Sequence, residues 1–379
     1  MAFRHPRRGT AHTTGRSGAA LPGAALSAVA LLALLSGCTG GKPATSSAGS
    51  SSAGSPGPAT APATSSGSGA VAIQSAYESV IRSALPSVVQ ITTGQALGSG
   101  IVLDDKGDIV TNAHVVGTSK KFQVTYADST APHPATLVGS YLPDDLAVIR
   151  VQNPGHVHPT TFADSSKLQV GQLVLALGNP LGLSSSVTDG IVSAVGRTVS
   201  EPQSADSPGA TIPQAIQTSA AINPGNSGGA LVDLSGHVVG IPTLAAVDPE
   251  LNGSAAPGIG FAIPSNLVKD IAGQLVATGR VTDSHRAALL AELTTVTDAS
   301  GQPVGVGVVS VKPKGPADSA GIHAGDVIVS IAGQAVGNAQ QVAQILAGLK
   351  VGATVPVVVT SPGSGRRTVQ VTLGELPGS

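Results

Sequence analysis

The stretch Gly225-Asn226-Ser227-Gly228-Gly229 is a tight, glycine-rich turn with one hydroxyl, and it is the most informative part of the chain. A serine between glycines can expose its Oγ as a nucleophile, and the N–H groups of Gly225 and Ser227 can converge on an oxyanion that develops beside it. A side chain at position 225 would crowd both the turn and the attacked carbonyl. Ser227 is therefore the candidate nucleophile, and Gly225 and Ser227 form the candidate oxyanion hole.

The residues around this turn decide between two known arrangements of a serine nucleophile. In the α/β-hydrolase arrangement a helix follows the serine, and the acid and the histidine come later in the chain. Here the apolar run Ala230-Leu231-Val232 follows as a strand, and strands do not alternate with helices. The order histidine, acid, serine is present instead: His114 ends one apolar run, and the pair Asp144-Asp145 begins another. These residues are the candidate base and the two candidate acids.

Short apolar runs at close spacing predict the fold around these residues. The 49 Gly and 27 Pro residues are too many for a helical bundle. Many short strands with turn signals predict a mainly β fold, an all-β barrel or sandwich. A short helix is expected before it, over Ser75–Leu85, and another after it, from Pro264-Ser265 to a stop at Gly279. The expected strands are Val88–Thr92, Ser99–Leu103, Ile109–Asn112, Lys121–Thr125, Leu146–Val151, Leu173–Leu177, Ile191–Val195, Ile216–Thr218, Ala230–Val232, Val238–Ile241 and Gly260–Ile263.

A second folded unit is expected from residue 281 to the end of the chain. One helix should begin after Asn338, a preferred N-cap residue, because Gln341 has the capping-box spacing and an apolar face follows. One helix and four strands predict a small α/β module with its own core. The strands are expected over Val306–Val311, Asp326–Ile331, Thr354–Thr360 and Thr368–Leu373.

The composition excludes several classes of protein. The chain carries 20 Lys and Arg residues against 21 Asp and Glu, so it lacks the positive charge with which nucleic-acid-binding proteins neutralise phosphates. Four Phe, three Tyr and no Trp provide no platform for base stacking. A single cysteine excludes an intrachain disulfide framework and a multi-cysteine zinc site, and no His, Asp or Glu cluster has ligand spacing. We therefore expect no nucleic-acid partner, no metal and no cofactor.

The first 38 residues have the pattern of an export signal. A basic leader precedes the apolar run Leu26–Leu35, which is shorter than the ~20 residues of a membrane span. The sequence Leu35-Ser36-Gly37-Cys38 resembles the bacterial lipobox, in which a peptidase cuts before a cysteine that becomes lipidated. We interpret residues 1–38 as a signal peptide with lipobox; a membrane anchor that stays uncleaved, with an unmodified Cys38, is the alternative. Residues 39–70, almost entirely Gly, Ala, Ser, Thr and Pro, are predicted to be a disordered linker.

The motifs together resemble those of the HtrA/Deg family of serine proteases. The resemblance implies a chymotrypsin/trypsin-like double β-barrel over residues 71–280, followed by a small α/β PDZ domain over residues 281–379. The stretches that carry it are spread along the chain: Gly98–Val102, Thr111–Val116, Asp145–Ile149, Gly178–Gly182, Gln217–Leu231 and Gly258–Pro264 in the first unit, and Gly315–Ile328 in the second.

The resemblance also assigns roles to individual residues. His114 would be the general base, Asp145 the acid that orients it, and Ser227 the nucleophile. Asp145 is preferred to Asp144 because it directly precedes the strand, as the acid of the family does. The residue before the nucleophile is Asn226 and not an acid, so no buried carboxylate awaits a new N-terminal ammonium, and activation by cleavage is not required.

Less specific sites follow from the same resemblance. An S1 pocket lined by Ala221, Thr243 and Ile259 contains no carboxylate, which favours a small aliphatic P1 residue such as Val or Ala. In PDZ domains a loop captures a C-terminal carboxylate, and a helix lines the groove for the added peptide strand. A Gly is usual in this loop where the chain has Leu290, so a folded appendage with weak binding is the alternative. The capture loop would be Ala288, Leu289, Leu290 and Ala291, and the groove residues would be Val342 and Ile345.

The sequence thus predicts an extracytoplasmic serine endopeptidase that is anchored through its N-terminus to the outer face of the bacterial cell membrane. Its substrates would be unfolded or damaged proteins and peptides, and its PDZ groove would bind C-terminal peptides. Because members of the family commonly form trimers, the resemblance also implies a homotrimer. The alternative is a catalytically silent, membrane-tethered PDZ adaptor.

Overall fold

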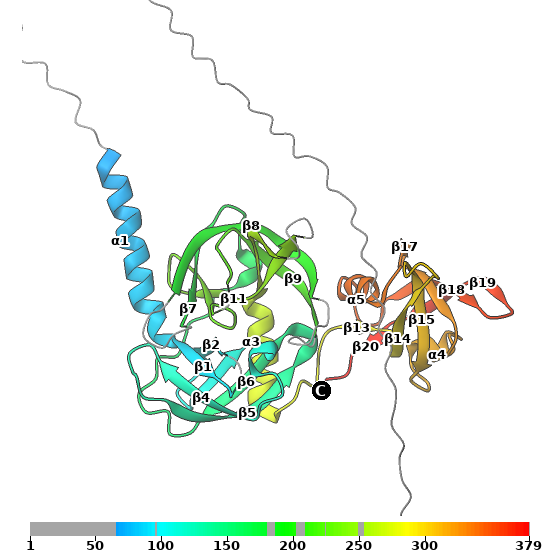
Figure 1. The fold of residues 1–379 in the computed structure, drawn as a ribbon, viewed down its shortest axis with the longest axis horizontal. Helices are drawn as coiled ribbons and strands as arrows, with labels where there is room; N and C mark the ends of the chain where they lie inside the picture. Colours follow the sequence, from blue (N-terminus) through cyan, green and yellow to red (C-terminus); the bar gives the residue numbers. More distant parts are fainter. Residues whose placement is uncertain are drawn as a thin grey trace, which may run out of the picture. The chain divides into compact units, whose positions relative to one another are not determined.

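The computed structural model describes residues 66–94, 97–179, 186–201, 209–223, 225–248 and 254–378. Two closed antiparallel barrels and a smaller module with its own sheet make up this part of the chain (Figure 1). The predicted export signal with Cys38, and the linker up to residue 65, lie outside the described residues. No helix in the described ranges combines the length and the apolar character needed to cross a lipid bilayer.

The first barrel has six strands in the order β1-β2-β3-β6-β5-β4. Alternate side chains point inward, and the interior is filled mainly by Val and Ile residues together with Phe122. Strand β3 ends at Thr111, just before His114, and β6 begins directly after Asp145, so both candidate residues lie at strand ends. The strands are β1 (Val88–Thr92), β2 (Leu97–Val102), β3 (Asp108–Thr111), β4 (Lys121–Tyr126), β5 (His133–Tyr141) and β6 (Leu146–Val151).

The second barrel closes in the order β10-β11-β12-β9-β8-β7. The long strands β8 and β9 pair through three register shifts, and such irregularities let strands bend around a barrel. The turn at residues 225–229 leads directly into β10. The strands are β7 (Leu173–Gly178), β8 (Ser186–Glu201), β9 (Ala210–Thr218), β10 (Ala230–Asp233), β11 (Val238–Asp248) and β12 (Ser254–Pro264).

One hydrophobic core is shared by the two barrels and two helices. It includes Tyr141 and Leu146 from the first barrel, and Val232 and Ile241 from the second. Helix α3 (Ser265–Thr278) adds buried side chains such as Ile271 and ends at the left-handed residue Gly279, as predicted. Helix α1 (Ser66–Ala84) packs its C-terminal turn into the same core. The shared core keeps the facing strand ends of the two barrels together.

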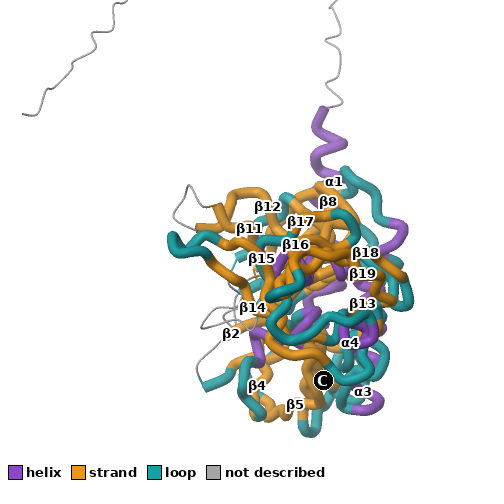
Figure 2. Tube along the Cα trace, turned by 90° about the vertical axis from the view of Figure 1, so that its right-hand side faces the viewer, coloured by secondary structure: helices purple, strands orange, loops and turns teal. Residues whose placement is uncertain are grey.

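The C-terminal module is a sheet in the order β14-β15-β16-β18-β19, with β17 paired to β16. Viewed from the side, strands dominate this module as well (Figure 2). The N-cap of its main helix is confirmed, because Asn338 Oδ1 accepts from Gln341 N at 2.9 Å. The elements are β13 (Ala287–Ala288), β14 (Ala291–Thr297), β15 (Pro303–Val311), α4 (Pro316–Ser319), β16 (Val327–Ile331), β17 (Gln334–Ala335), α5 (Ala339–Ala347), β18 (Thr354–Ser361), β19 (Gly365–Thr372) and β20 (Gly374–Glu375).

The predicted fold class, a double β-barrel followed by a small α/β domain, is confirmed. The predicted start of the first helix is wrong: α1 begins at Ser66 and not at Ser75, so residues 66–70, assigned to the disordered linker, are helical. Val71 and Ile73 in this extension are 63% and 52% exposed, so packing does not hold it. Once a helix is nucleated, adding further turns costs little, and this explains the longer helix.

Candidate active site

Asp145 lies at the end of a short turn that fixes its backbone. The 3-10 turn η2 (Leu142–Asp144) is followed by Asp145 in the left-handed region, at φ 52° and ψ 42°. Its N–H donates to Leu142 O at 3.0 Å, and its carbonyl accepts from Ala113 N and from Asn112 Nδ2, each at 3.1 Å. The residue is 2% exposed. The backbone of Asp145 is thus tied to the segment that carries His114.

The Asp145 carboxylate holds His114 through two hydrogen bonds. Oδ1 accepts from the His114 backbone N–H at 2.9 Å, and Oδ2 lies 2.8 Å from His114 Nδ1. A proton on Nδ1 satisfies this contact and leaves Nε2 as the basic nitrogen of the ring. Helix α2 (Ala113–Val116) presents the imidazole, whose side chain is 23% exposed, at the barrel edge. This pair has the geometry of a histidine base with its orienting acid.

The turn that carries Ser227 is fixed to the first barrel through Ser99. Ser99 N donates to Ser227 O at 3.1 Å, and Ser99 Oγ donates to Gly225 O. Gly228, at φ 79°, packs so closely that an added Cβ would lie 2.3 Å from Ser99 O and 2.4 Å from Thr111 Oγ1. Only glycine fits there. Because Thr111 also ends the strand before His114, these contacts bring the serine turn and the histidine turn to the same edge.

The loop before Ser227 is stabilised by its own hydrogen bonds, and the N–H groups of Gly225 and Ser227 are its candidate oxyanion hole. Asn226 is 2% exposed and stabilises its own loop. Its Oδ1 accepts from Asn223 N at 3.1 Å, and its Nδ2 donates to Ala221 O at 2.9 Å. Neither Gly225 N–H nor Ser227 N–H donates to another residue in the described part of the chain. Donors without an internal acceptor can bind an oxyanion, so the assignment of Gly225 and Ser227 stays a prediction that this geometry supports.

Thr243 has a contact that the sequence analysis did not predict. Its side chain is 5% exposed, and its hydroxyl donates to Asp145 Oδ2. The second barrel therefore helps to hold the acid of the first. Of the other residues assigned to the S1 pocket, Ala221 is exposed and Ile259 is 38% exposed. These three residues stay a prediction for the S1 pocket.

The residues assigned to the PDZ groove differ in how deeply they are buried. Leu290 has φ 54°, a left-handed conformation in which a family glycine would be unstrained, and its carbonyl accepts from Lys312 N at 2.9 Å. Val342, expected at the groove, is 1% exposed within the module's core, whereas Ile345 is partly buried. Ala288 and Leu289 are buried, and Ala291 begins the edge strand β14, which contacts α5. The groove itself stays a prediction.

Two family models match the chain. The model of the trypsin-like peptidase domain matches residues 98–241, a range that contains His114, Asp145 and Ser227. The model of the PDZ domain matches residues 307–360. The two matches lie in the two parts that the fold distinguishes.

Several proteins of known function are similar to the chain. Serine protease PepD of Mycobacterium tuberculosis is 40% identical over 316 residues, which cover 79% of this chain and 66% of PepD. Periplasmic serine endoprotease DegP of Escherichia coli is 42% identical over 246 residues, covering 64% of this chain and 49% of DegP. Serine endoprotease DegS of Escherichia coli is 34% identical over 319 residues, covering 80% of this chain and 87% of DegS. The chain thus spans about two thirds of PepD and about half of DegP.

Solved structures of proteases are also similar to the chain. The serine endoprotease from Yersinia pestis is 32% identical, with a TM-score of 0.53, over 79% of this chain and 98% of that one. The HtrA-type protease AlgW with tripeptide is 31% identical, also with a TM-score of 0.53, over 79% of this chain and 97% of that one.

The hydroxyl of Thr243 should matter for the reactivity of Ser227. Replacing Thr243 with Val removes a hydrogen bond to a charged group, a change that predicts a roughly tenfold to hundredfold lower rate of Ser227 labelling by a fluorophosphonate. The rate constant of labelling, followed by mass spectrometry, measures the effect. Thr243→Ser keeps the hydroxyl and is the matched control, with a rate close to that of the wild type. Equal rates for the Val and Ser variants would contradict a role for this hydroxyl.

Proposed function

The chain belongs to the HtrA family of serine proteases, with a trypsin-like peptidase domain and a PDZ domain, and we propose that it is an exported endopeptidase acting on unfolded or damaged proteins. The observation that carries this proposal is the 2.8 Å contact between His114 Nδ1 and Asp145 Oδ2, at the barrel edge where Ser99 holds the turn of Ser227.

The proposed mechanism follows from these groups. His114 takes the proton of Ser227 Oγ as the oxygen attacks a peptide carbonyl, and Asp145 stabilises the imidazolium that forms. The N–H groups of Gly225 and Ser227 receive the oxyanion of the tetrahedral intermediate. His114 then protonates the leaving amine, and an acyl-enzyme on Ser227 remains. Water, deprotonated by the same histidine, releases the second product.

The site of action is proposed from the N-terminus and from the relatives. One relative is named a periplasmic endoprotease, which supports an extracytoplasmic location for this chain. The lipobox-like sequence at Cys38 supports attachment to the outer face of the cell membrane. Assembly as a homotrimer is proposed from the family alone.

The PDZ domain is proposed to bind C-terminal peptides and to regulate the protease domain. An extended peptide can add to the edge of β14 beside α5, with its carboxylate at the loop Ala288–Ala291. The solved structure of an HtrA-type protease with a tripeptide supports peptide binding in this family.

Replacing Ser227 with Ala should remove the nucleophile and leave the fold intact. The expected loss of turnover is ~10⁶-fold, because the triad acts as a unit. Hydrolysis of an unfolded protein such as casein by the purified full chain measures the loss, with circular dichroism as the control for folding. Appreciable proteolysis by the variant would contradict the assignment. A wild-type protein that neither cleaves nor reacts with a fluorophosphonate would favour the silent adaptor.

The P1 preference should be small and aliphatic. Because no carboxylate occurs at Ala221, Thr243 or Ile259, Lys and Arg gain no charge partner in the proposed pocket. Mass spectrometry of a peptide library cleaved by the full chain should give Val and Ala at P1. The same library with Ser227→Ala identifies cleavage by contaminants. A preference for Arg would contradict the pocket.

The PDZ domain should recognise a free C-terminal carboxylate. In the Ser227→Ala background, a peptide with a free C-terminus should bind roughly tenfold or more tightly than its amidated form, because hydrogen bonds to a charged group are lost in the amide. Leu290→Gly should increase the affinity, since a glycine removes the restriction that the leucine side chain places on changes in the loop's conformation when the peptide binds. Calorimetry measures both effects. Equal, weak binding of the two peptides would favour a folded appendage.

A further inference from the structure

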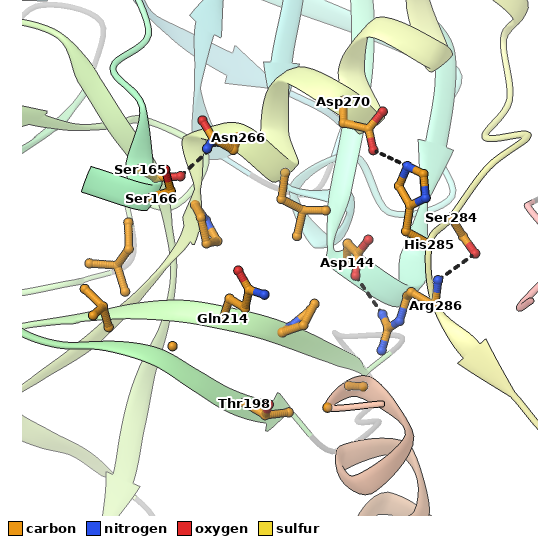
Figure 3. A pocket seen from close by; sticks show the side chains of 18 of the residues that line it. Asp144, Ser165, Ser166, Thr198, Gln214, Asn266, Asp270, Ser284, His285 and Arg286 are labelled. Atoms are coloured by element: carbon orange, nitrogen blue, oxygen red, sulfur yellow. Dashed lines mark hydrogen bonds and ion pairs between the residues drawn. The ribbon is translucent and has the colours of Figure 1, made fainter. Parts of the chain in front are cut away.

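The turn that precedes Asp145 accepts hydrogen bonds from an arginine that is distant in the sequence. Arg286 Nη1 donates to Asp144 Oδ1 at 2.7 Å (Figure 3). The same nitrogen donates to Pro143 O at 2.6 Å. The side chain of Asp144 is completely buried, and that of Arg286 is 9% exposed. One nitrogen thus fixes both a main-chain and a side-chain oxygen of the turn η2, whose next residue is Asp145.

The backbone around Arg286 is in turn fixed by the C-terminal segment. Arg286 O accepts from Leu376 N at 2.7 Å, and Ser284 Oγ donates to Leu376 O at 2.6 Å. Glu375 Oε1 accepts from the N–H groups of Ser284 and His285 at 2.6 and 3.0 Å. Because the main chain on both sides is held, the guanidinium is a fixed contact for η2 and not a flexible surface side chain.

The charges around Asp144 indicate that its contact with Arg286 contributes little to the stability of the fold. Burial raises the pKa of Asp144 to about 6 although Arg286 favours the carboxylate, and Asp270 on α3 raises the pKa further. Nearby, Tyr141 is buried, and His285 pairs with Asp270 at 3.5 Å. Asp144 Oδ2 has no partner among the described residues. A buried pair with an unsatisfied oxygen contributes little net stability, and such pairs are better explained by the geometry that they impose.

We propose that Arg286 is a positioning residue for the reaction at Ser227, acting through the Pro143–Asp144 turn on the left-handed backbone of Asp145. The inference rests on the proposed function, since it assigns a role in that same reaction. Asp145 must keep its carboxylate within hydrogen-bond distance of His114, and a displacement of about 1 Å in such a group can lower a rate roughly a hundredfold. Arg286 does not contact the substrate in this scheme, so it acts on kcat and not on KM.

The test compares two full-chain variants that both lack the buried carboxylate. Asp144→Asn keeps an oxygen that accepts from Arg286, whereas Asp144→Asn with Arg286→Met removes the guanidinium without leaving a buried charge. We expect the double variant to have a kcat roughly tenfold to hundredfold below that of Asp144→Asn, with an unchanged KM for a peptide substrate. We also expect its downfield proton resonance from His114 Nδ1–H, observed by NMR, to shift or broaden. Equal kcat values and the same resonance in the two variants would overturn the proposal.

A matched pair elsewhere separates positioning from a general loss of stability. Arg367 Nη2 donates to Asp326 Oδ2 at 2.9 Å within the C-terminal module, and Asp326 is likewise buried. Asp326→Asn with Arg367→Met should leave kcat and the His114 resonance unchanged; a loss equal to that of the Arg286 variant would overturn the proposal.

Two further comparisons apply if the double variant does not fold or if the wild-type chain is inactive. If the double variant does not fold, Arg286→Lys replaces it. The lysine side chain is one bond shorter, so its nitrogen does not reach the position of Nη1. A kcat equal to that of the wild type would then overturn the proposal. The NMR readout needs no turnover. A wild-type chain without protease activity would therefore count against the proposed function, while the resonance still decides the role of Arg286.

Discussion

Asp145 is held in a backbone conformation that L-residues other than glycine rarely adopt, and most of the site depends on its staying there. The left-handed region costs roughly 1–2 kcal/mol for such a residue, although a short polar side chain lowers the cost. Contacts from separate parts of the fold offset it. Asn112 and Ala113 of the first barrel bind its carbonyl, Thr243 of the second barrel binds its carboxylate, and Arg286 holds the preceding turn. The proposed triad thus depends on the assembled fold and not on one loop.

The position of Ser227, the proposed nucleophile, depends on the same strands. Ser99 binds the carbonyls on both sides of Asn226, and Thr111 Oγ1 donates to Ser99 O at 2.6 Å. Gly228 fills the remaining space against these two residues. The position of Ser227 is therefore set by the barrel that carries His114, although the serine itself belongs to the second barrel. A shift between the barrels would act on the serine and on the acid together.

The sequence predicts the short, apolar strands well and the irregular ones poorly. Strands β1 and β6 match their expected bounds, because a short apolar run bounded by polar residues leaves little choice of register. Strand β5 was not predicted. It begins with His133 and Pro134 and shows no clean alternation of buried and exposed residues. Strand β8 extends beyond the run Ile191–Val195 at both ends. Residues 186–190 pair with β7, and residues 197–201 pair with β9 through register shifts, which leave no period in the sequence.

The sequence likewise predicts some residues of the candidate site and not others. Motifs predict His114, the acidic pair and Ser227 as site residues, since chemistry restricts the residue types that can occur there. No local pattern identifies the contacts of Thr243 and Arg286 with the turn at Asp145, because their partners lie 98 and 142 residues away in the chain. The local sequence does not distinguish this threonine in a strand, or this arginine in a connecting segment, from other residues of the same type.

The two neighbouring acids, between which the family resemblance favours Asp145, lie in different environments. Both carboxylate oxygens of Asp145 accept from donors, His114 N–H on one side and His114 Nδ1 with Thr243 Oγ1 on the other. Asp144 has one bonded oxygen, and burial raises its pKa to about 6. The left-handed residue turns the successive side chains apart. The strained backbone therefore separates a carboxylate that contacts a histidine from a second acid whose hydrogen-bond partner among the described residues is Arg286.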